Sequence, residues 1–291
     1  MSMWGSRLRD RLASGVPVLM PGAWDALSAR LAHRAGFDTV FLSGYCVSAT
    51  LLGLPDFGYL SQTEMAETAR RVCTANPELM VVVDGDTGYG NPLSVRRTVD
   101  LWEDAGATGI FIEDQVWPKR CGHMDGKEVV PVDDWLAKLA AAVEQRTDLF
   151  VTARTDARAV IGLDEAIDRA RAAVEVGVDA VFVEAPESIT ELQAISESLP
   201  AVTLVANMVE GGKTPLLTPA ELHDLGFDLI VSPLSVLFGA VRAMQVDLAT
   251  LAEHGTLRDH VDSVVGFDEF GDLVDLAHHQ QLDARSTLPT T

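Results

Sequence analysis

A short loop brings a thiol, an imidazole and two cations close together in the chain. It spans residues 117–131 and contains the run Lys-Arg-Cys-Gly-His, whose chemically active side chains are Lys119, Arg120, Cys121 and His123. Neighbouring cations lower the pKa of a thiol and attract anionic substrates. The loop could therefore carry a catalytic cysteine, although a solvated surface loop with a chance cysteine explains the same residues.

Carboxylates gather after two apolar runs further toward the N-terminus. Asp84 and Asp86 stand two residues apart among glycines, and Glu113 follows the next apolar run. Mg2+ usually takes one or two carboxylates and completes its octahedron with water and substrate, so these residues are candidate metal ligands. Asp56 is a fourth candidate. The alternatives are that one aspartate caps a turn while the other is solvated, and that Asp56 is only a turn residue.

Other polar residues suit a substrate carboxylate. The planar fork of Arg154 could bind one, but an ion pair with Glu184 or Asp156 would explain this arginine equally well. The run Ser43, Gly44 and Tyr45 offers backbone N–H groups and a hydroxyl to an oxyanion, or is simply a tight turn. Residues 206–215, which include Asn207, resemble a glycine-rich anion loop without the Walker spacing, and we interpret them as a carboxylate loop.

Eight short apolar runs indicate how these side chains could meet. The runs are nearly continuous rather than alternating, which is typical of strands buried on both faces of a parallel sheet. They cover residues 16–20, 38–42, 79–83, 109–112, 149–153, 180–183, 202–206 and 228–231. Because amphipathic segments separate them, we predict an α/β protein with a (β/α)8 TIM barrel, and a doubly wound sheet as the alternative. The carboxyl ends of barrel strands converge on one site.

Capping signals support the helices between these strands. Ser61, Ser188 and Thr218 each precede a glutamate by three residues, as in a capping box, and Asn91 precedes a proline. Glycines at positions 36, 106, 177 and 226 each follow a helical segment and precede a strand. Glycine adopts the left-handed conformation of a helix C-terminus without penalty, so we expect it to end four helices.

The barrel is expected to occupy residues 1–255 as the catalytic domain, with a helical extension at 256–291. A long helix is predicted at 236–253 and an amphipathic one at 267–279, after the eighth strand is complete. An additional apolar helix packs most simply on the barrel or on another subunit, and we favour a homo-oligomer, either dimer or tetramer. Residues 286–291 are expected to be disordered.

Composition excludes several classes of partner. The chain has 291 residues, 43 acids against 22 bases and a net charge of −21, with no long basic cluster, which argues against nucleic acid. The N-terminus lacks a signal-peptide pattern, and we expect no membrane-spanning stretch and a cytoplasmic location. The three cysteines lack disulfide or zinc spacing, which fits reduced thiols.

Five motifs, in order, resemble those of the isocitrate lyase/phosphoenolpyruvate mutase superfamily. They are residues 84–90, 113–115, 119–123, 153–157 and 206–215. The resemblance extends from about residue 10 to about residue 275. It is closest to the branch of the petal death protein and carboxyphosphonoenolpyruvate phosphonomutase, through residues 52–58 and 113–124.

The resemblance implies a Mg2+-dependent barrel, with Mn2+ as an alternative ion. Members usually form tetramers built from dimers that exchange a C-terminal helix. Their substrates are small di- or tricarboxylates or phosphonates, which react through an enolate-like intermediate. On this basis Asp84 and Asp86 would hold the ion directly or through water, with Glu113 and Asp56 in support.

The resemblance also implies roles around the substrate. Cys121, flanked by Lys119 and Arg120 on a mobile lid, would protonate the carbanion left by bond cleavage, and Arg154 would bind the C1 carboxylate. The remaining pocket residues would be Ser43, Gly44, Tyr45, His123, Glu184, Asn207 and Pro233.

These features predict a carbon–carbon lyase that cleaves a 2-hydroxy dicarboxylate, such as a 2-alkylmalate or a relative of methylisocitrate, by retro-aldol chemistry. A phosphonomutase, an oxaloacetate hydrolase and a non-catalytic barrel are the alternatives. Phe41 and Tyr45 depart from the methylisocitrate lyase pattern, and Pro233 stands where the hydrolases tend to carry serine.

Overall fold

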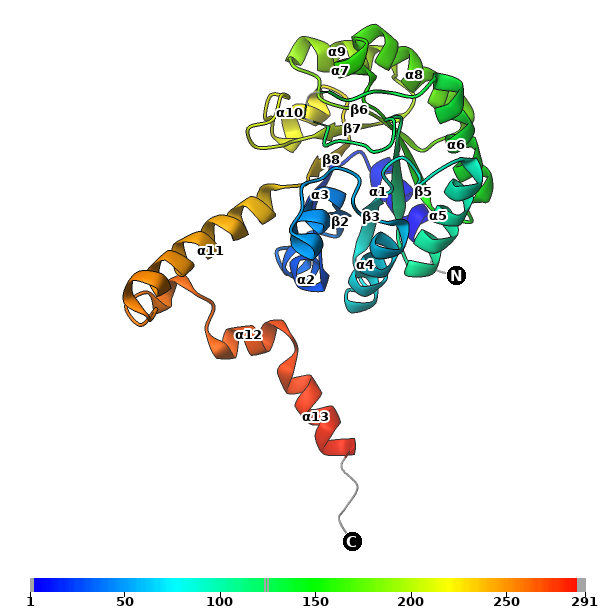
Figure 1. Cartoon of the computed structure of the whole chain (residues 1–291). Helices are drawn as coiled ribbons and strands as arrows, with labels where there is room; N and C mark the ends of the chain where they lie inside the picture. The colour runs from blue at the N-terminus through cyan, green and yellow to red at the C-terminus, as the bar shows by residue number, and fades with distance from the viewer. Residues whose placement is uncertain (1–2, 123, 125, 287–291) are drawn as a thin grey trace. The chain divides into compact units, whose positions relative to one another are not determined.

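The chain forms a closed barrel of eight parallel strands surrounded by helices in this computed structural model, which describes residues 3–122, 124 and 126–286 (Figure 1). Each strand pairs with the next, and β8 pairs with β1. The strands are β1 (Val18–Ala23), β2 (Thr39–Leu42), β3 (Met80–Asp84), β4 (Gly109–Glu113), β5 (Phe150–Thr155), β6 (Ala180–Val183), β7 (Thr203–Asn207) and β8 (Leu229–Ser232). The prediction of a (β/α)8 barrel is confirmed.

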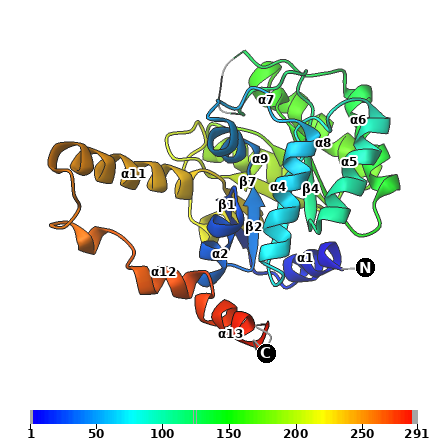
Figure 2. The same ribbon diagram turned by 60° about the horizontal axis from the view of Figure 1, so that its bottom comes forward.

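Helices between the strands cover the outside of the barrel (Figure 2). The helices up to β8 are α1 (Trp4–Ala13), α2 (Ala26–Arg34), α3 (Gly44–Val47), α4 (Gln62–Ala75), α5 (Pro92–Ala105), α6 (Val132–Gln145), α7 (Ala157–Val160), α8 (Leu163–Val176), α9 (Ile189–Ser198) and α10 (Pro219–Asp224). After β8 the chain continues as α11 (Ser235–His254), α12 (Phe267–Leu273) and α13 (Leu276–Ser286). A π-helical turn, Ser48–Leu52, extends α3, and a 3-10 turn, Val261–Ser263, follows α11.

Several strand boundaries differ from the sequence prediction. β1 begins two residues later and ends three residues later than residues 16–20, because Pro21 and Gly22 continue the strand instead of forming a turn. Its first part pairs with β8 and its last two residues pair with β2. A Cβ atom at Gly22 would lie 1.9 Å from the carbonyl oxygen of Pro233, so glycine permits this close approach.

The strands are mostly apolar up to their carboxyl ends because they separate two buried layers. Side chains that point inward fill the barrel, and they include Met20, Phe41, Met80, Val82, Phe111, Phe150, Phe182 and Val231. Side chains that point outward pack against the helices, and they include Leu42, Val81, Val83, Ile110, Ile112, Val151, Val181 and Ile230. Both sides of each strand are therefore removed from water, as the continuous apolar runs predicted.

Most of the capping predictions are confirmed. Ser61 and Thr218 form reciprocal capping boxes, and Asn91 accepts a hydrogen bond from the backbone of Ser94 at the start of α5. The four glycines at helix ends have left-handed φ angles of 97° (Gly36), 89° (Gly106), 95° (Gly177) and 91° (Gly226). These short turns return the chain to the amino end of the next strand.

The capping box expected at Ser188 is only half formed. The Ser188 hydroxyl accepts from the Glu191 backbone, but the Glu191 carboxylate accepts from the backbone of Glu187 and pairs with Arg158 at 2.7 Å. A charged partner competes with the cap for the same carboxylate.

Helix α1 closes the amino end of the barrel. Its Leu8 is fully buried within the cluster that fills the barrel interior. Asp148, just before β5, accepts hydrogen bonds from the backbone N–H groups of Gly5 (2.7 Å) and Ser6 (3.0 Å). A carboxylate at a helix N-terminus satisfies unpaired donors and complements the helix dipole. The opposite end of the barrel remains for the polar strand ends.

The chain divides into two compact units, Met1–Leu237 and Phe238–Thr291. This division falls inside α11, before the expected domain boundary at residue 255. The helix predicted at 267–279 is two helices, because Asp275 adopts a left-handed φ of 56° between α12 and α13. Ser286 ends α13, and residues 287–291 of the expected disordered tail lie outside the described residues.

Helix α11 contradicts the expectation that no stretch is long and apolar enough to cross a membrane. Among the described helices it meets that criterion by length and composition. However, Arg242 and Asp247 lie in its middle. Each charge costs about 3 kcal/mol at the centre of a bilayer, so these residues favour contact with protein over lipid.

Candidate active site

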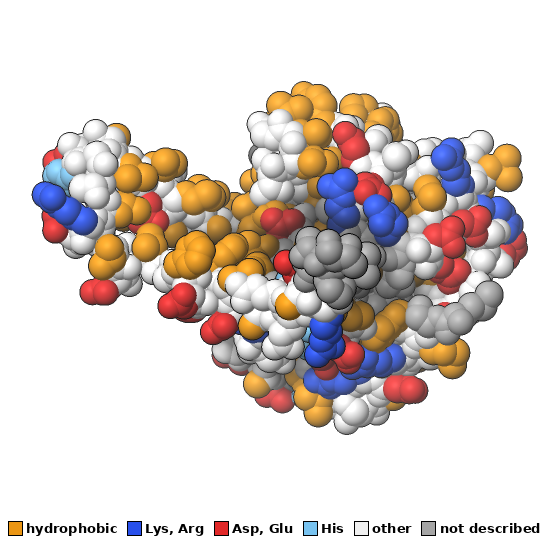
Figure 3. Space-filling model, turned by 90° about the horizontal axis from the view of Figure 1, so that it is seen from below, with side chains coloured by type: hydrophobic (Ala, Val, Ile, Leu, Met, Phe, Trp, Pro, Cys, Tyr) orange, Lys and Arg blue, Asp and Glu red, His pale blue; other side chains and the backbone are white. Residues whose placement is uncertain are grey.

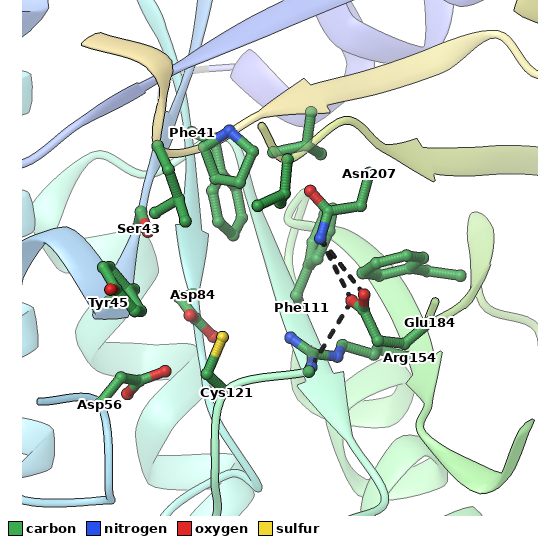
Figure 4. Close-up of a pocket in the computed structure, with 16 residues that line it drawn as sticks. Phe41, Ser43, Tyr45, Asp56, Asp84, Phe111, Cys121, Arg154, Glu184 and Asn207 are labelled. Atoms are coloured by element: carbon green, nitrogen blue, oxygen red, sulfur yellow. Dashed lines mark hydrogen bonds and ion pairs between the residues drawn. The ribbon is translucent and has the colours of Figure 1, made fainter. Parts of the chain in front are cut away.

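Polar residues from several strand ends line one cavity at the carboxyl end of the barrel (Figure 4). Nine residues predicted from the sequence line it, namely Ser43, Tyr45, Asp56, Asp84, Cys121, Arg154, Glu184, Asn207 and Pro233. Because β3, β4, β5, β7 and β8 end one or two residues later than predicted, Asp84, Glu113 and Arg154 belong to the strands themselves. Their backbones are thus held by the barrel's hydrogen bonds.

The rest of the cavity wall is apolar. Phe41, Phe111 and Phe182 belong to the barrel's interior layer. The ring centroid of Phe111 lies 4.9 Å from that of Phe41 and 5.9 Å from that of Phe182. Val209 and Leu234 contribute from the loop after β7 and the segment after β8. Neither residue could be identified from the sequence, because their side chains carry no reactive group and the fold brings them to the cavity.

Arg154 lines the cavity and forms the ion pairs that were the alternative interpretation, while its binding of a substrate carboxylate stays a prediction. Its Nε donates to Asp156 Oδ2 at 3.0 Å, and its other nitrogens lie 3.3 Å from Glu113 Oε2 and 3.6 Å from Glu184 Oε2. The Asn207 amide donates to Glu184 at 3.3 Å. These partners hold the guanidinium in place, and 14% of the side chain remains exposed.

Asp84 is oriented by two backbone donors. Its carboxylate oxygens accept from the N–H groups of Gly44 at 3.2 Å and Asp86 at 3.1 Å. A Cβ atom at position 44 would lie 2.8 Å from Asp84 Oδ2, which explains the glycine there. Asp86 has a left-handed φ of 44°, an uncommon conformation for a residue with a side chain. Backbone strain of this kind is concentrated at functional sites.

Four buried carboxylates form an acidic cluster, namely Asp56, Asp84, Asp86 and Glu113. Lys119 lies inside this cluster and does not line the cavity. Its Nζ is 2.6 Å from Asp56 Oδ1 and 2.7 Å from Asp86 Oδ1, and its side chain is 3% exposed. This position differs from the expected role of attracting substrate from solution. The ammonium instead links the loop after β4 to the carboxylates.

The cluster holds more negative charge than its own cations balance. Burial raises the pKa of Asp86 to about 6, against the opposing effect of Lys119, and burial also raises the pKa of Glu113 well above its usual range. Nearby carboxylates add to both shifts. A divalent cation would compensate this charge.

The donor set fits a hydrated Mg2+ ion. Glu113 Oε1 is buried and has no hydrogen-bond partner among the described atoms, so it remains available to a metal-bound water. Among the described residues, no three Asp, Glu, His or Cys side chains converge tightly enough to enclose a metal by themselves. The carboxylates predicted as ligands therefore do not form a complete metal site by themselves within the described part of the chain, and their role as Mg2+ ligands stays a prediction.

The loop after β4 is closed at its base by backbone pairing. Gln115 bridges Val129, and the Val116 N–H donates to the Glu128 carbonyl at 2.8 Å. The Gln115 side chain exchanges two hydrogen bonds with the backbone of Arg120, at 2.8 and 2.9 Å. These bonds shape the turn that precedes Cys121.

The loop directs one of its predicted chemical groups into the cavity. Cys121 points from the loop toward Asp84 (Figure 4). Arg120 is exposed, does not line the cavity, and has its guanidinium 5.9 Å from the ring centroid of Phe57. His123 lies outside the described residues.

Gly122 also contacts the site, although its role was not identified from the sequence. A Cβ atom there would lie 2.6 Å from both Arg154 Nη2 and Glu184 Cδ. The loop backbone therefore lies directly against the arginine and glutamate, where only glycine fits. The sequence feature that could have indicated this contact is the glycine directly after Cys121.

Known proteins resemble the chain over nearly its full length. The sequence model of the phosphoenolpyruvate phosphomutase family matches residues 8–252 of this chain. The petal death protein of Dianthus caryophyllus is 49% identical over 270 residues, which cover 92% of this chain and 85% of that protein. The 2,3-dimethylmalate lyase of Eubacterium barkeri is 43% identical over 281 residues, which cover 96% of both chains.

Solved structures share the fold as well as sequence. A crystal structure of 2,3-dimethylmalate lyase superimposes with a TM-score of 0.93 at 33% identity, over 98% of this chain and 96% of that chain. A phosphonopyruvate hydrolase crystallised with oxalate and Mg2+ has a TM-score of 0.87 at 29% identity, over 98% and 99% of the two chains.

Proposed function

The chain belongs to the phosphoenolpyruvate phosphomutase family, and we propose that it cleaves a carbon–carbon bond in a 2-hydroxy dicarboxylate of the 2-alkylmalate type. Members of this family are lyases and mutases, and the chain is an enzyme. One observation carries the proposal: Cys121 lines the same cavity as Arg154 and an apolar wall. The cavity thus combines an acid, a partner for a carboxylate and an apolar wall that an alkyl group could contact.

The cavity's charges favour an alkyl dicarboxylate over a tricarboxylate. Among the described residues that line it, Arg154 is the one cation. It would bind one carboxylate through its planar fork, while the backbone and hydroxyls at Ser43 and Tyr45 would contact another polar group. Val209 and Leu234 would contact the alkyl substituent, where a third carboxylate would be desolvated without a partner.

Mg2+ would be held by Asp84 and Asp86, directly or through water, with Glu113 and Asp56 in support. When bound, the ion would stabilise negative charge that develops on a substrate oxygen. Gly44 and Asp86 already orient the Asp84 carboxylate through their backbone N–H groups, so little rearrangement of that side chain is required.

The bond changes balance with Cys121 as a proton donor. The 2-hydroxyl loses its proton, the C2–C3 bond breaks, and C2 becomes the carbonyl carbon of a 2-oxo acid. The electron pair remains on C3 as an enolate-like carbanion conjugated with its carboxylate. The Cys121 thiol then gives its proton to C3, and the proton released from the hydroxyl restores the thiol in the net balance.

A substrate panel tests this proposal. The enzyme is incubated with Mg2+ and 2,3-dimethylmalate, another 2-alkylmalate, 2-methylisocitrate, oxaloacetate or phosphonopyruvate, and products are followed by proton and phosphorus NMR. We expect a 2-oxo acid and a second carboxylate from an alkylmalate, and loss of this activity with EDTA that excess Mg2+ restores.

Two outcomes would contradict the proposal. Turnover of phosphonopyruvate alone would indicate phosphonate chemistry, which the name of the matching family also describes. Turnover of oxaloacetate alone would indicate a hydrolase. Alkylmalate cleavage that continues in EDTA would support the lyase activity but contradict its dependence on Mg2+.

A further inference from the structure

We propose that Lys127 is a positioning residue that holds the Cys121 turn and the Arg154 guanidinium in a fixed mutual arrangement. The residue stands in the loop after β4, directly after Gly126, and contributes no atom to the cavity wall. The inference rests on the proposed function, because the thiol and the guanidinium act together only in that reaction.

Lys127 is buried although it belongs to a loop. Its side chain is 2% exposed, and Nζ donates to Asp156 Oδ1 at 2.8 Å. The same ammonium donates to the backbone carbonyl of Gly122, the residue that follows Cys121. Burial of an ammonium is unfavourable unless it is paired and hydrogen-bonded, so these two partners define its position. The ammonium therefore joins the Cys121 turn to the end of β5.

Asp156 is shared between Lys127 and Arg154. Its two carboxylate oxygens accept from Arg154 Nε at 3.0 Å and Nη2 at 3.2 Å. The Asp156 backbone N–H donates in turn to Asp114 Oδ1 at 2.8 Å, and Asp114 is paired with Arg169 at 3.1 Å. All of these carboxylates are fully buried. Asp156 is thus a rigid support on which both cations rest.

The loop is attached to the barrel on two sides of the thiol. Lys119 attaches it to Asp56 and Asp86 in the acidic cluster, two residues before Cys121. Lys127 attaches it beside Arg154, six residues after Cys121. Without Lys127, the Cys121 turn would be held by Lys119 and by the hydrogen bonds between Gln115 and Arg120, which all lie before the thiol in the chain. The second attachment fixes both the direction of the thiol and the contact between Gly122 and Arg154.

The experiment compares three variants of the full-length enzyme. Lys127→Met removes the charge at similar length, Lys127→Arg keeps it, and Glu128→Gln changes an exposed side chain in the same loop as the matched control. The first measurement is the rate at which iodoacetamide alkylates Cys121, followed by mass spectrometry of its peptide. Burial raises the pKa of Cys46 and Cys73 to about 12, so these thiols react slowly and serve as internal references.

We expect Cys121 in Lys127→Met to react about 10- to 100-fold faster than in the native enzyme, which is the factor set by one charge-assisted hydrogen bond. Lys127→Arg should restore most of the protection, and Glu128→Gln should react at the native rate. An unchanged rate in Lys127→Met would overturn the proposal. If that variant does not fold, Lys127→Gln is subject to the same expectation.

Steady-state kinetics provide the second measurement. Lys127→Met should raise KM for the dicarboxylate, because Arg154 loses a neighbour that fixes Asp156, and should lower kcat because the thiol is misplaced. A purely structural role would reduce the folded fraction without changing either constant per folded molecule, and that result would also overturn the proposal. Absence of native turnover would contradict the proposed function alone, since the alkylation rates still decide the role of Lys127.

Discussion

The thiol of Cys121 allows a direct test of the acid at the scale of one residue. In Cys121→Ser a hydroxyl, a far weaker acid, replaces the thiol in the cavity. We expect kcat to fall by roughly 10²- to 10⁴-fold, the usual contribution of a general acid, while KM changes little because Arg154 is intact. Cys73→Ser on α4 is the control and should retain native kinetics. A fully active Cys121→Ser enzyme would remove the thiol from the mechanism.

Gly122 provides a second test, which asks how closely the loop after β4 approaches Arg154 and Glu184. The methyl group of Gly122→Ala would lie 2.6 Å from Arg154 Nη2 and Glu184 Cδ, so the loop or the guanidinium must shift. A shift of about 1 Å at reacting groups can cost on the order of 10²-fold in rate, and we expect a loss of kcat/KM of that size.

The control for this change is Glu128→Ala, which alters an exposed side chain of the same loop and should leave kcat/KM at its native value. A crystal structure of Gly122→Ala should show the displaced group. Native kinetics in Gly122→Ala would mean that the loop lies further from Arg154 during the reaction than it does here.

The residue types predicted which side chains line the site better than they predicted which side chains pair with one another. Asp84, Cys121 and Arg154 were predicted to meet, and they line one cavity. The ammonium of Lys119 was expected to face substrate, yet it is buried against Asp56 and Asp86. Spacing along a loop does not reveal which side chains turn inward, because that depends on contacts with distant strands. Lys127 was missed for the same reason.

At the scale of elements, periodicity and capping were sufficient for most of the barrel. Continuous apolar runs predicted eight buried strands, because a parallel strand between two layers has no polar side. The end of β1 was wrong because Pro21 and Gly22 usually mark a turn, whereas pairing with β8 and β2 keeps them extended. The break at Asp275 was missed because aspartate seldom adopts a left-handed φ.

Helix α1 yields a prediction about stability. Leu8 is fully buried in the cluster that fills the barrel, so Leu8→Ala removes apolar contact and leaves a cavity at the amino end. Such substitutions usually cost about 2–5 kcal/mol in the free energy of unfolding, and we expect a loss in that range in urea denaturation. The catalytic constants of the folded enzyme should remain native, because the site lies at the other end of the strands.

Asp10→Ala, on the exposed side of the same helix, is the matched control and should change the free energy of unfolding by less than about 0.5 kcal/mol. Equal, small effects of Leu8→Ala and Asp10→Ala would show that α1 contributes little to the barrel's stability.

At the scale of the whole molecule, the C-terminal unit lacks a core of its own. Among residues 238–286 that the structure describes, only Gly271 and Leu273 are buried. Large apolar side chains are exposed instead, including Met244, Val246, Leu248 and Phe267, and hydrophobic side chains gather along this unit's surface (Figure 3). A segment this small rarely folds without a partner surface, so we propose that a second copy of the chain covers it.

Phe267 is the most informative position for testing this assembly, because it is 87% exposed at the start of α12. Burial of a phenylalanine contributes about 1.5–3 kcal/mol, and a glutamate would be desolvated without a partner in its place. Phe267→Glu should therefore weaken the association of subunits by about 10- to 100-fold or more, measured by analytical ultracentrifugation across a concentration series. Glu269→Ala, a polar change in the same helix, should leave the association constant unchanged. A native enzyme that sediments as a monomer at all concentrations would contradict the assembly, and the apolar surface of α11 and α12 would then require a different partner.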